Sequence, residues 1–259
     1  MRFIFVSYLF YFIENIYSCT IKNILFNTYS KHTYLGYTNA RKILYSQLSD
    51  ILIYGDNNCK LKKDKNCEHI WSRTYCEYKE PMISDLHILY LSNSKLNSHR
   101  QSYKFDEVYN NYILLDNYGN KINDSINNEV NKLYKKNCSK KIFEPPNKSK
   151  GKISRALGYF ILVYPEYKKY LPHIIDIDTL IKWNINSPVS FNEIYKNEII
   201  RKYQGNINPY IKYPILLNLL NGNNTDIFCM LKLFIITIYT ILLSICFNII
   251  IKLKFLFIY

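Results

Sequence analysis

Negative charge is scarce in this 259-residue chain, which has 20 Asp and Glu against 34 Lys and Arg and a formal net charge of +14. This deficit favours a polyanionic partner, either nucleic acid or an anionic membrane surface. The abundance of Asn, Lys, Ile and Tyr, which an AT-rich gene would also produce, is an alternative origin of the same imbalance. The chain also lacks internal repeats. Without its terminal segments, its length fits one ordinary domain with a substantial core.

Charge is absent altogether from residues 233–251, near the C-terminus. An apolar run of this length can cross a bilayer as a helix, so we predict a transmembrane helix over 231–252, with a buried core helix as the alternative. Lys252 and Lys254 would hold the tail in the cytosol. Residues 1–19 carry an early basic residue and an apolar run, which predicts a signal peptide or an uncleaved signal anchor. We therefore expect a single-pass membrane protein of the secretory pathway, with the intervening domain luminal or extracellular.

The chain contains no Cys-x-x-Cys pair, the close spacing that is typical of zinc sites. Four cysteines remain between the terminal segments: Cys59, Cys67, Cys76 and Cys138. In a secretory domain, four cysteines predict two disulfides, with three alternative pairings. A zinc site is the rival interpretation.

The remaining pattern predicts a mixed α+β fold in which helices outnumber strands. Residues 20–38 read as a variable leader, and apolar residues at helical spacing predict a helix over 39–52. Short strands are expected within 66–92, and the polar stretch 109–141 reads as a loop or insertion. The segment ISRALGYFILVY predicts a largely buried helix that ends before Pro165.

The clearest predicted helix is SFNEIYKNEIIRKYQG, residues 190–205. Ser190 and Glu193 have the spacing of a capping box, and Gly205 can end the helix. Four apolar residues are expected to share one face of it: Phe191, Ile194, Tyr195 and Ile199.

Polar groups that suit phosphodiester hydrolysis occur close together in the middle of the chain. Hydrolysis needs a base for water and a hard cation to neutralise phosphate. His69 can act as the base near neutral pH, and the oxygens of Glu68 and Asn97 suit Mg²⁺, which keeps several waters. Glu68 and His69 are neighbours, and neighbours on a regular strand point to opposite faces. The strand must therefore bend or end here if both serve one site.

Four blocks of the sequence closely resemble, in order, successive blocks of the endonuclease I family. They are NCEHIW, EPMISDLHILYLSNSKLNSHRQSYKFDEV, FEPPNKSKGKISRALGYF and KWNINSPVSFNEIYKNEIIRKYQGNINPYIKYPIL. The resemblance covers residues 38–217, and we expect a family-like domain over 39–220. The family consists of secreted, non-specific nucleases with a ββα-metal (His-Me) finger. The resemblance thus implies an α+β nuclease core of mostly helices with a small sheet.

The resemblance also implies roles for individual residues. His69 matches the general base, and Glu68 and Asn97 match the ligands of a divalent cation, Mg²⁺ or alternatively Mn²⁺ or Ca²⁺. Arg155 matches a catalytic arginine near the phosphate, and Arg100 matches an arginine that is structural or contacts phosphate.

Charge and position add Arg73, in the loop after NCEHIW, as a contact to nucleic acid. The expected substrate is DNA, with RNA left open, and the expected state is a monomer.

The sequence departs from the family pattern at several supporting positions. Ser72 replaces a usual Pro, Ile88 a usual His, Ser102 a usual Asn and Lys212 a usual Asp. None of these changes removes the base or the metal ligands. An alternative interpretation is a catalytically inactive, membrane-anchored protein that binds nucleic acid.

Overall fold

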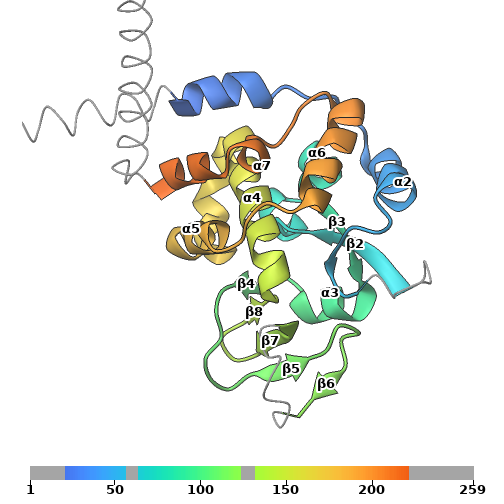
Figure 1. Ribbon diagram of the computed structural model, residues 1–259, viewed down its shortest axis with the longest axis vertical. Helices are drawn as coiled ribbons and strands as arrows, with labels where there is room; N and C mark the ends of the chain where they lie inside the picture. Colours follow the sequence, from blue (N-terminus) through green and yellow to red (C-terminus); the bar gives the residue numbers. More distant parts are fainter. Residues whose placement is uncertain (1–20, 57–63, 124–131, 222–259) are drawn as a thin grey trace, which may run out of the picture.

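The computed structural model describes residues 21–56, 64–123 and 132–221. Figure 1 shows the larger helices gathered at one end and a small sheet at the other. The α-helices are α2 (Tyr37–Gln47), α3 (Ser94–Arg100), α4 (Asn147–Val163), α5 (Ile177–Ile185), α6 (Phe191–Gln204) and α7 (Pro209–Lys212). The 3₁₀ helices are η2 (Arg73–Cys76), η3 (Met82–Ser84), η5 (Pro165–His173) and η6 (Pro214–Asn221). The strands are β1 (Leu52–Tyr54), β2 (Lys65–His69), β3 (Leu89–Asn93), β4 (Lys104–Phe105), β5 (Ile113–Leu115), β6 (Lys121–Ile122), β7 (Tyr134–Asn137) and β8 (Ile142–Glu144).

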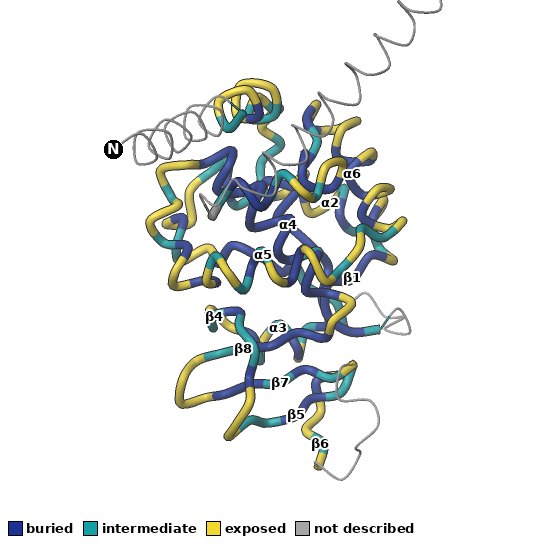
Figure 2. The backbone as a smooth tube through the Cα atoms, turned by 60° about the vertical axis from the view of Figure 1, so that its left-hand side comes forward, coloured by how far each residue is buried: buried dark blue, intermediate teal, exposed yellow. Residues whose placement is uncertain are grey.

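Helix α4 is the centre of the helical layer. It is buried on all sides from Ser149 to Val163 except at Lys152, as the dark central tube in Figure 2 shows. It packs against α5, η5, α7 and η6. The helix ends at Val163 because Pro165 disfavours helical backbone at the residue before it. The buried helix predicted before Pro165 is confirmed.

A three-stranded sheet, in the order β1-β3-β2, lies beside these helices. Its middle strand β3 is buried at every position, while β2 pairs with β3 alone and forms an edge of the sheet. Helix α3 begins directly after β3. The Asn93 side chain accepts hydrogen bonds from the backbone N–H groups of Lys95 and Leu96, which caps α3 at the sheet. The strands expected within 66–92 are present.

A second sheet, in the order β4-β8-β7-β5-β6, corrects the expectation that 109–141 is only a loop or insertion. Strands β5, β6 and β7 lie within that stretch, in its described residues. The polar sequence gives no strand pattern for them, because a lysine side chain occupies a buried position in this sheet. Lys136 of β7 is buried with its Nζ 4.6 Å from the centre of the Tyr103 ring. The expected α+β class is confirmed, with two small sheets.

Two predicted helices differ in detail from the structure. The helix expected over 39–52 is α2, which ends at Gln47, because Leu52 instead enters β1 and pairs in register with Leu91. Helix α6 has the predicted capping box and ends at Gly205 in the left-handed conformation, φ 85°.

The apolar face expected on α6 is exposed at three of its four positions. Phe191, Ile194 and Tyr195 are 78%, 49% and 44% exposed, and only Ile199 is buried. Lys196 lies on the buried side instead, donating to the Leu89 carbonyl with its ammonium over the Tyr90 ring.

The prediction of two disulfides is also wrong. Cys67, Cys76 and Cys138 are free, and Cys59 lies outside the described residues. The three thiols belong to different environments. Cys67 packs against a second hydrophobic cluster that includes Ala40 and Leu44 of α2, Cys76 is buried in the main core, and Cys138 is exposed.

The described ranges contain no helix with the length and apolar character needed to cross a bilayer. The predicted transmembrane helix 231–252 and the predicted signal segment 1–19 lie outside those ranges.

Candidate active site

A hollow of about 320 Å³ lies at the end of β2, between η2 and α3. Five of the six sequence-predicted site residues line it: Glu68, His69, Arg73, Asn97 and Arg100. The rest of its wall is formed by Cys67, Ser72, Thr74, Tyr78, Gln101 and Ser102. The structure therefore brings together a carboxylate, an imidazole, an amide and two guanidinium groups.

The position of β2 explains how two adjacent side chains reach one hollow. Glu68 points toward β1, where the Tyr54 hydroxyl donates to its Oε1 at 3.2 Å. His69 points the other way, toward α2, where its ring lies 5.5 Å from the ring of Tyr37. Because β2 is an edge strand that ends at His69, the hollow can take side chains from both faces of the sheet.

His69 is held as a neutral imidazole. Its Nε2 lies 3.0 Å from the carbonyl oxygen of Ile83, and because a carbonyl only accepts, Nε2 carries the proton. Burial lowers the pKa of His69 to about 4, and the charges of Arg73 and Arg100 act in the same direction. The ring is therefore uncharged near neutral pH, with its unprotonated nitrogen at Nδ1.

The Glu68 carboxylate is buried, which disfavours its charged form. It is 2% exposed, and burial raises its pKa to about 7, although Arg100 and the hydrogen bond from Tyr54 oppose the shift. Arg100 Nη1 lies 3.4 Å from Glu68 Oε1. A buried carboxylate whose charge is incompletely compensated favours a cation beside it.

Asn97 has one orientation fixed by its neighbours. Its Nδ2 donates to Asn66 Oδ1 at 2.8 Å and to the Cys67 carbonyl at 3.1 Å. Both amide protons therefore point toward β2. The amide oxygen, on the other side of the group, is left to accept or to bind a cation.

These donors fit a hard divalent cation. Glu68 and Asn97 supply two oxygens at one hollow, and Mg²⁺ is commonly bound through few protein oxygens while it keeps several waters. In the ranges that the structure describes, no group of three or more His, Cys, Asp or Glu side chains is arranged to hold a metal ion.

The two arginines of the hollow differ in what their charge can do. Arg100 is 2% exposed, and it donates to the carbonyls of His69 and Ile70 at 3.3 and 3.0 Å. It thus holds the end of β2, which fits the structural alternative expected for it, and its contact with nucleic acid stays a prediction. Arg73 is exposed, with its guanidinium 5.4 Å from the ring centre of Tyr78, and it can meet a phosphate in the hollow.

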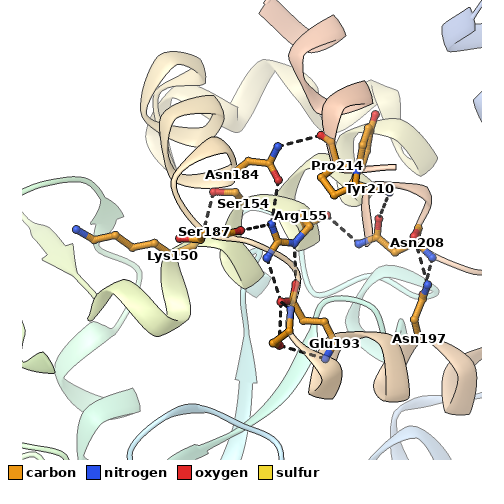
Figure 3. Close-up of polar contacts among 11 residues, drawn as sticks. Lys150, Ser154, Arg155, Asn184, Ser187, Glu193, Asn197, Asn208, Tyr210 and Pro214 are labelled. Carbon is orange, nitrogen blue, oxygen red and sulfur yellow. Dashed lines mark hydrogen bonds and ion pairs between the residues drawn. The ribbon is translucent and has the colours of Figure 1, made fainter. Parts of the chain in front are cut away.

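Arg155 is the predicted site residue that the structure places elsewhere. It is 1% exposed, and it donates from Nε and Nη2 to the two carboxylate oxygens of Glu193 at 2.7 and 3.0 Å. Its Nη1 donates to Asn184 and to the Ser187 carbonyl (Figure 3). All of its nitrogens are used in joining α4 to α5 and α6, so we assign it to packing rather than to the hollow.

Sequence reasoning missed the groups that orient the site. Tyr54 and Tyr37 contact the carboxylate and the imidazole, and the Ile83 carbonyl fixes the histidine tautomer. The chain has 26 tyrosines, and nothing in the sequence distinguishes these two from the others.

A family model described as Endonuclease I matches residues 8–215, which is more than half of the chain. The match spans every residue that lines the hollow. No curated protein matches the chain.

Proposed function

The chain belongs to the endonuclease I family, and on that premise we propose that it is a metal-dependent, largely sequence-nonspecific endonuclease. It would hydrolyse phosphodiester bonds of DNA, with RNA as an alternative substrate. The observation that carries this proposal is the convergence of Glu68, His69 and Asn97 on one hollow, with His69 neutral. A base that is already unprotonated at neutral pH can accept a proton from water without first losing one.

His69 Nδ1 would accept the proton of the attacking water. The hydrogen bond from Nε2 to Ile83 leaves Nδ1 as the only ring nitrogen with a free lone pair, and the contact with Tyr37 restrains the ring. Hydroxide then attacks phosphorus in line, the bond from phosphorus to the leaving 3′ oxygen breaks, and that oxygen takes a proton from solvent. The ring returns its proton to solvent afterwards.

Glu68 and Asn97 would hold the cation. A divalent cation held by these two oxygens would supply positive charge that offsets the negative charge developing on the phosphate. Arg73 would neutralise further charge on the phosphate from the exposed side of the hollow. Arg100 keeps the backbone of His69 and Ile70 in place through hydrogen bonds to their carbonyls.

Plasmid cleavage tests the proposal directly. We expect the full chain to nick and linearise plasmid DNA with Mg²⁺ and to stop when EDTA is added. The His69→Ala variant should lose roughly 10²- to 10⁴-fold in rate, the range that a general base contributes. His173→Ala removes an exposed imidazole outside the hollow and serves as the control. A His69→Ala variant as active as the parent would refute the assignment of the base.

The rival function is nucleic-acid binding without catalysis. Ser102, one of the departures from the family pattern, lies in the wall of the hollow and gives this rival a structural basis. DNA binding by the parent with no cleavage in Mg²⁺, Mn²⁺ or Ca²⁺ would favour it. Comparing DNA with RNA in the same assay settles the substrate preference.

We also propose that the protein is a single-pass membrane protein with its nuclease domain luminal or extracellular. The support is the uncharged run 233–251 followed by Lys252 and Lys254. Recovery of the full chain in the supernatant after carbonate extraction of membranes would contradict this location.

A further inference from the structure

A second and larger hollow lies along α2, on the same side of the three-stranded sheet as His69. It measures about 860 Å³, and the described residues that line it include no acidic side chain. We call it the α2 groove, and its lining residues are Tyr37, Thr38, Arg41, Lys42, Tyr45, Ser46 and Lys65. Three of these seven residues are cations, and the others all carry a hydroxyl group. Such a lining suits a chain of phosphates, because cations and hydroxyl groups are the usual partners of the nucleic-acid backbone.

The α2 groove leads to the active-site hollow along β2. Lys65, Cys67 and His69 alternate along this strand, so their side chains share one face. Lys65 lines the groove, and Cys67 and His69 line the hollow. Tyr37 lines the groove and also contacts the His69 ring. The distance along the strand from Lys65 to His69 is about 13 Å, which is short enough for one strand of nucleic acid to contact both the groove and the hollow.

Two of the three cations of the groove, Arg41 and Lys65, are restrained by neighbouring groups. The Arg41 guanidinium lies 5.7 Å from the ring centre of Tyr37 and 5.9 Å from that of Tyr45, so two rings from the same helix restrain it. Arg41 and Lys42 are both exposed. Lys65 donates to the Ser49 carbonyl, which uses one of its three N–H donors.

The tyrosine rings favour backbone binding over base stacking. The Tyr37 ring contacts both His69 and Arg41, and the Tyr45 hydroxyl donates to the Lys65 carbonyl. These contacts position the rings as supports for Arg41. A concave surface beside a hydrolytic site also suits a strand of nucleic acid better than a flat lipid surface.

We propose that the α2 groove binds the phosphate backbone of the substrate on one side of the bond to be cleaved. This inference rests on the proposed nuclease function and adds a binding track to it. Arg41 and Lys42 contact successive phosphates, and Lys65 lies where the strand enters the active-site hollow. Binding is independent of base sequence, because none of these contacts reads a base edge.

Equilibrium binding in EDTA tests the track separately from cleavage. The full chain is titrated into a fluorescent DNA duplex about two helical turns long, over a range of NaCl concentrations. Arg41→Ala/Lys42→Ala should raise Kd roughly tenfold and reduce the slope of log Kd against log salt by about 1.8, which is 0.9 for each lost phosphate contact. Both residues are exposed on a helix, so alanine is compatible with folding, which circular dichroism verifies.

Two control variants distinguish the loss of phosphate contacts in the groove from a general loss of positive charge. Lys140→Ala/Lys212→Ala removes two exposed lysines that do not line the groove, and it should leave Kd within twofold and the slope unchanged. Arg41→Lys/Lys42→Arg keeps the charges and should keep the slope. Equal losses in the groove variant and the lysine control would overturn the proposal, as would no loss or no DNA binding by the parent.

A vesicle titration tests whether the α2 groove binds an anionic lipid surface instead of nucleic acid. If Arg41→Ala/Lys42→Ala loses binding to phosphatidylserine vesicles while its Kd for DNA is unchanged, the groove contacts lipid and the proposal is wrong. Cleavage of plasmid by the parent is scored independently. An active enzyme with an irrelevant groove, and a DNA-binding groove on an inactive protein, therefore give different results.

Discussion

At the scale of single residues, the sequence indicated which side chains meet in the hollow but not how they are oriented there. Glu68, His69 and Asn97 were identified from residue type and resemblance, and the structure brings them to one hollow. The histidine tautomer depends on the Ile83 carbonyl, 14 residues away in the chain. A backbone carbonyl is the same in every residue, so the sequence gives no signal for such a partner.

For Arg155, the sequence could not distinguish a packing role from a contact with the substrate. Its family position predicted a phosphate contact, yet its nitrogens bind Glu193, Asn184 and Ser187 inside the helical layer. Residue type and position cannot tell a buried guanidinium with a carboxylate partner from one that faces a substrate. The difference depends on which helices pack together.

The two arginines of the hollow should respond differently to lysine. Arg73→Lys keeps an exposed positive charge, so we expect its kcat/KM to stay within about threefold of the parent value. We expect a larger loss for Arg73→Ala, because an exposed phosphate contact depends on the charge of the side chain more than on its shape.

Arg100→Lys removes the guanidinium fork that holds the carbonyls of His69 and Ile70. We expect kcat and metal affinity to fall by roughly 10- to 100-fold, the usual effect of losing a group that orients a metal ligand.

Steady-state kinetics and calorimetric Mg²⁺ titration measure both effects. A purely structural role for Arg100 would lower thermal stability without changing the metal affinity of the folded protein. Equal tolerance of lysine at both positions would contradict the distinction between an orienting and a phosphate-binding arginine.

At the scale of elements, α6 shows which local signals can be trusted. Its start and end were predicted because capping depends on residues close in sequence: Ser190 and Glu193 form the capping box, and Gly205 adopts the left-handed conformation. The apolar face expected on α6 is mostly exposed, and Lys196 is buried instead, because it contacts a carbonyl and a tyrosine ring, which hydrophobic periodicity does not register. The polar strands of 109–141 were missed for the same reason.

Glu193 belongs to both the cap and the buried ion pair, so α6 allows a graded test of stability. Ser190→Ala removes one cap acceptor and should cost about 1 kcal/mol of unfolding free energy. Glu193→Ala also leaves Arg155 buried without its carboxylate and should cost about 3–5 kcal/mol. Urea unfolding at neutral pH measures both values.

Arg155→Met/Glu193→Leu removes both charges and tests the packing role of Arg155. Because apolar side chains can replace a buried ion pair at little cost, this variant should be more stable than Glu193→Ala. We also expect it to keep cleavage activity. A folded double variant with no activity would return Arg155 to the catalytic groups.

At the scale of the whole molecule, a buried polar network around Asp85 joins segments that are distant in sequence. The Asp85 carboxylate accepts hydrogen bonds from Tyr159 of α4, from Tyr164 directly after α4, and from Gln204 of α6. His32, in the segment before α2, has its Nε2 3.2 Å from the Tyr164 hydroxyl oxygen. Burial opposes the charge of Asp85, but the neighbouring imidazoles and the hydrogen bond from Gln204 hold its pKa below the usual value.

His87 makes this network sensitive to acid. Its ring is 2% exposed and packs on Tyr159, and burial lowers its pKa to about 4, with Asp85 opposing the shift and Lys196 adding to it. The unfolded chain protonates this group near pH 6.5, so below that pH it binds a proton that the folded protein does not. Stability should therefore be constant above about pH 6.5 and fall between about 6.5 and 4 by up to about 3 kcal/mol from His87. His69 shifts in the same direction and adds to the slope.

Urea unfolding at a series of pH values, with the parent and His87→Leu, isolates this contribution. The variant should be less stable than the parent at pH 7.5, because leucine loses the ring contact with Tyr159. Its free energy of unfolding should nevertheless fall less steeply with acid between pH 6.5 and 4. The slope should be smaller than that of the parent by about 1.4 kcal/mol for each pH unit, because the proton that only the unfolded parent binds at His87 is no longer present. If the two slopes are equal, His87 is protonated in the folded protein. In that case its charge would be held by Asp85, and the network would be an ion pair rather than a neutral imidazole beside a carboxylate.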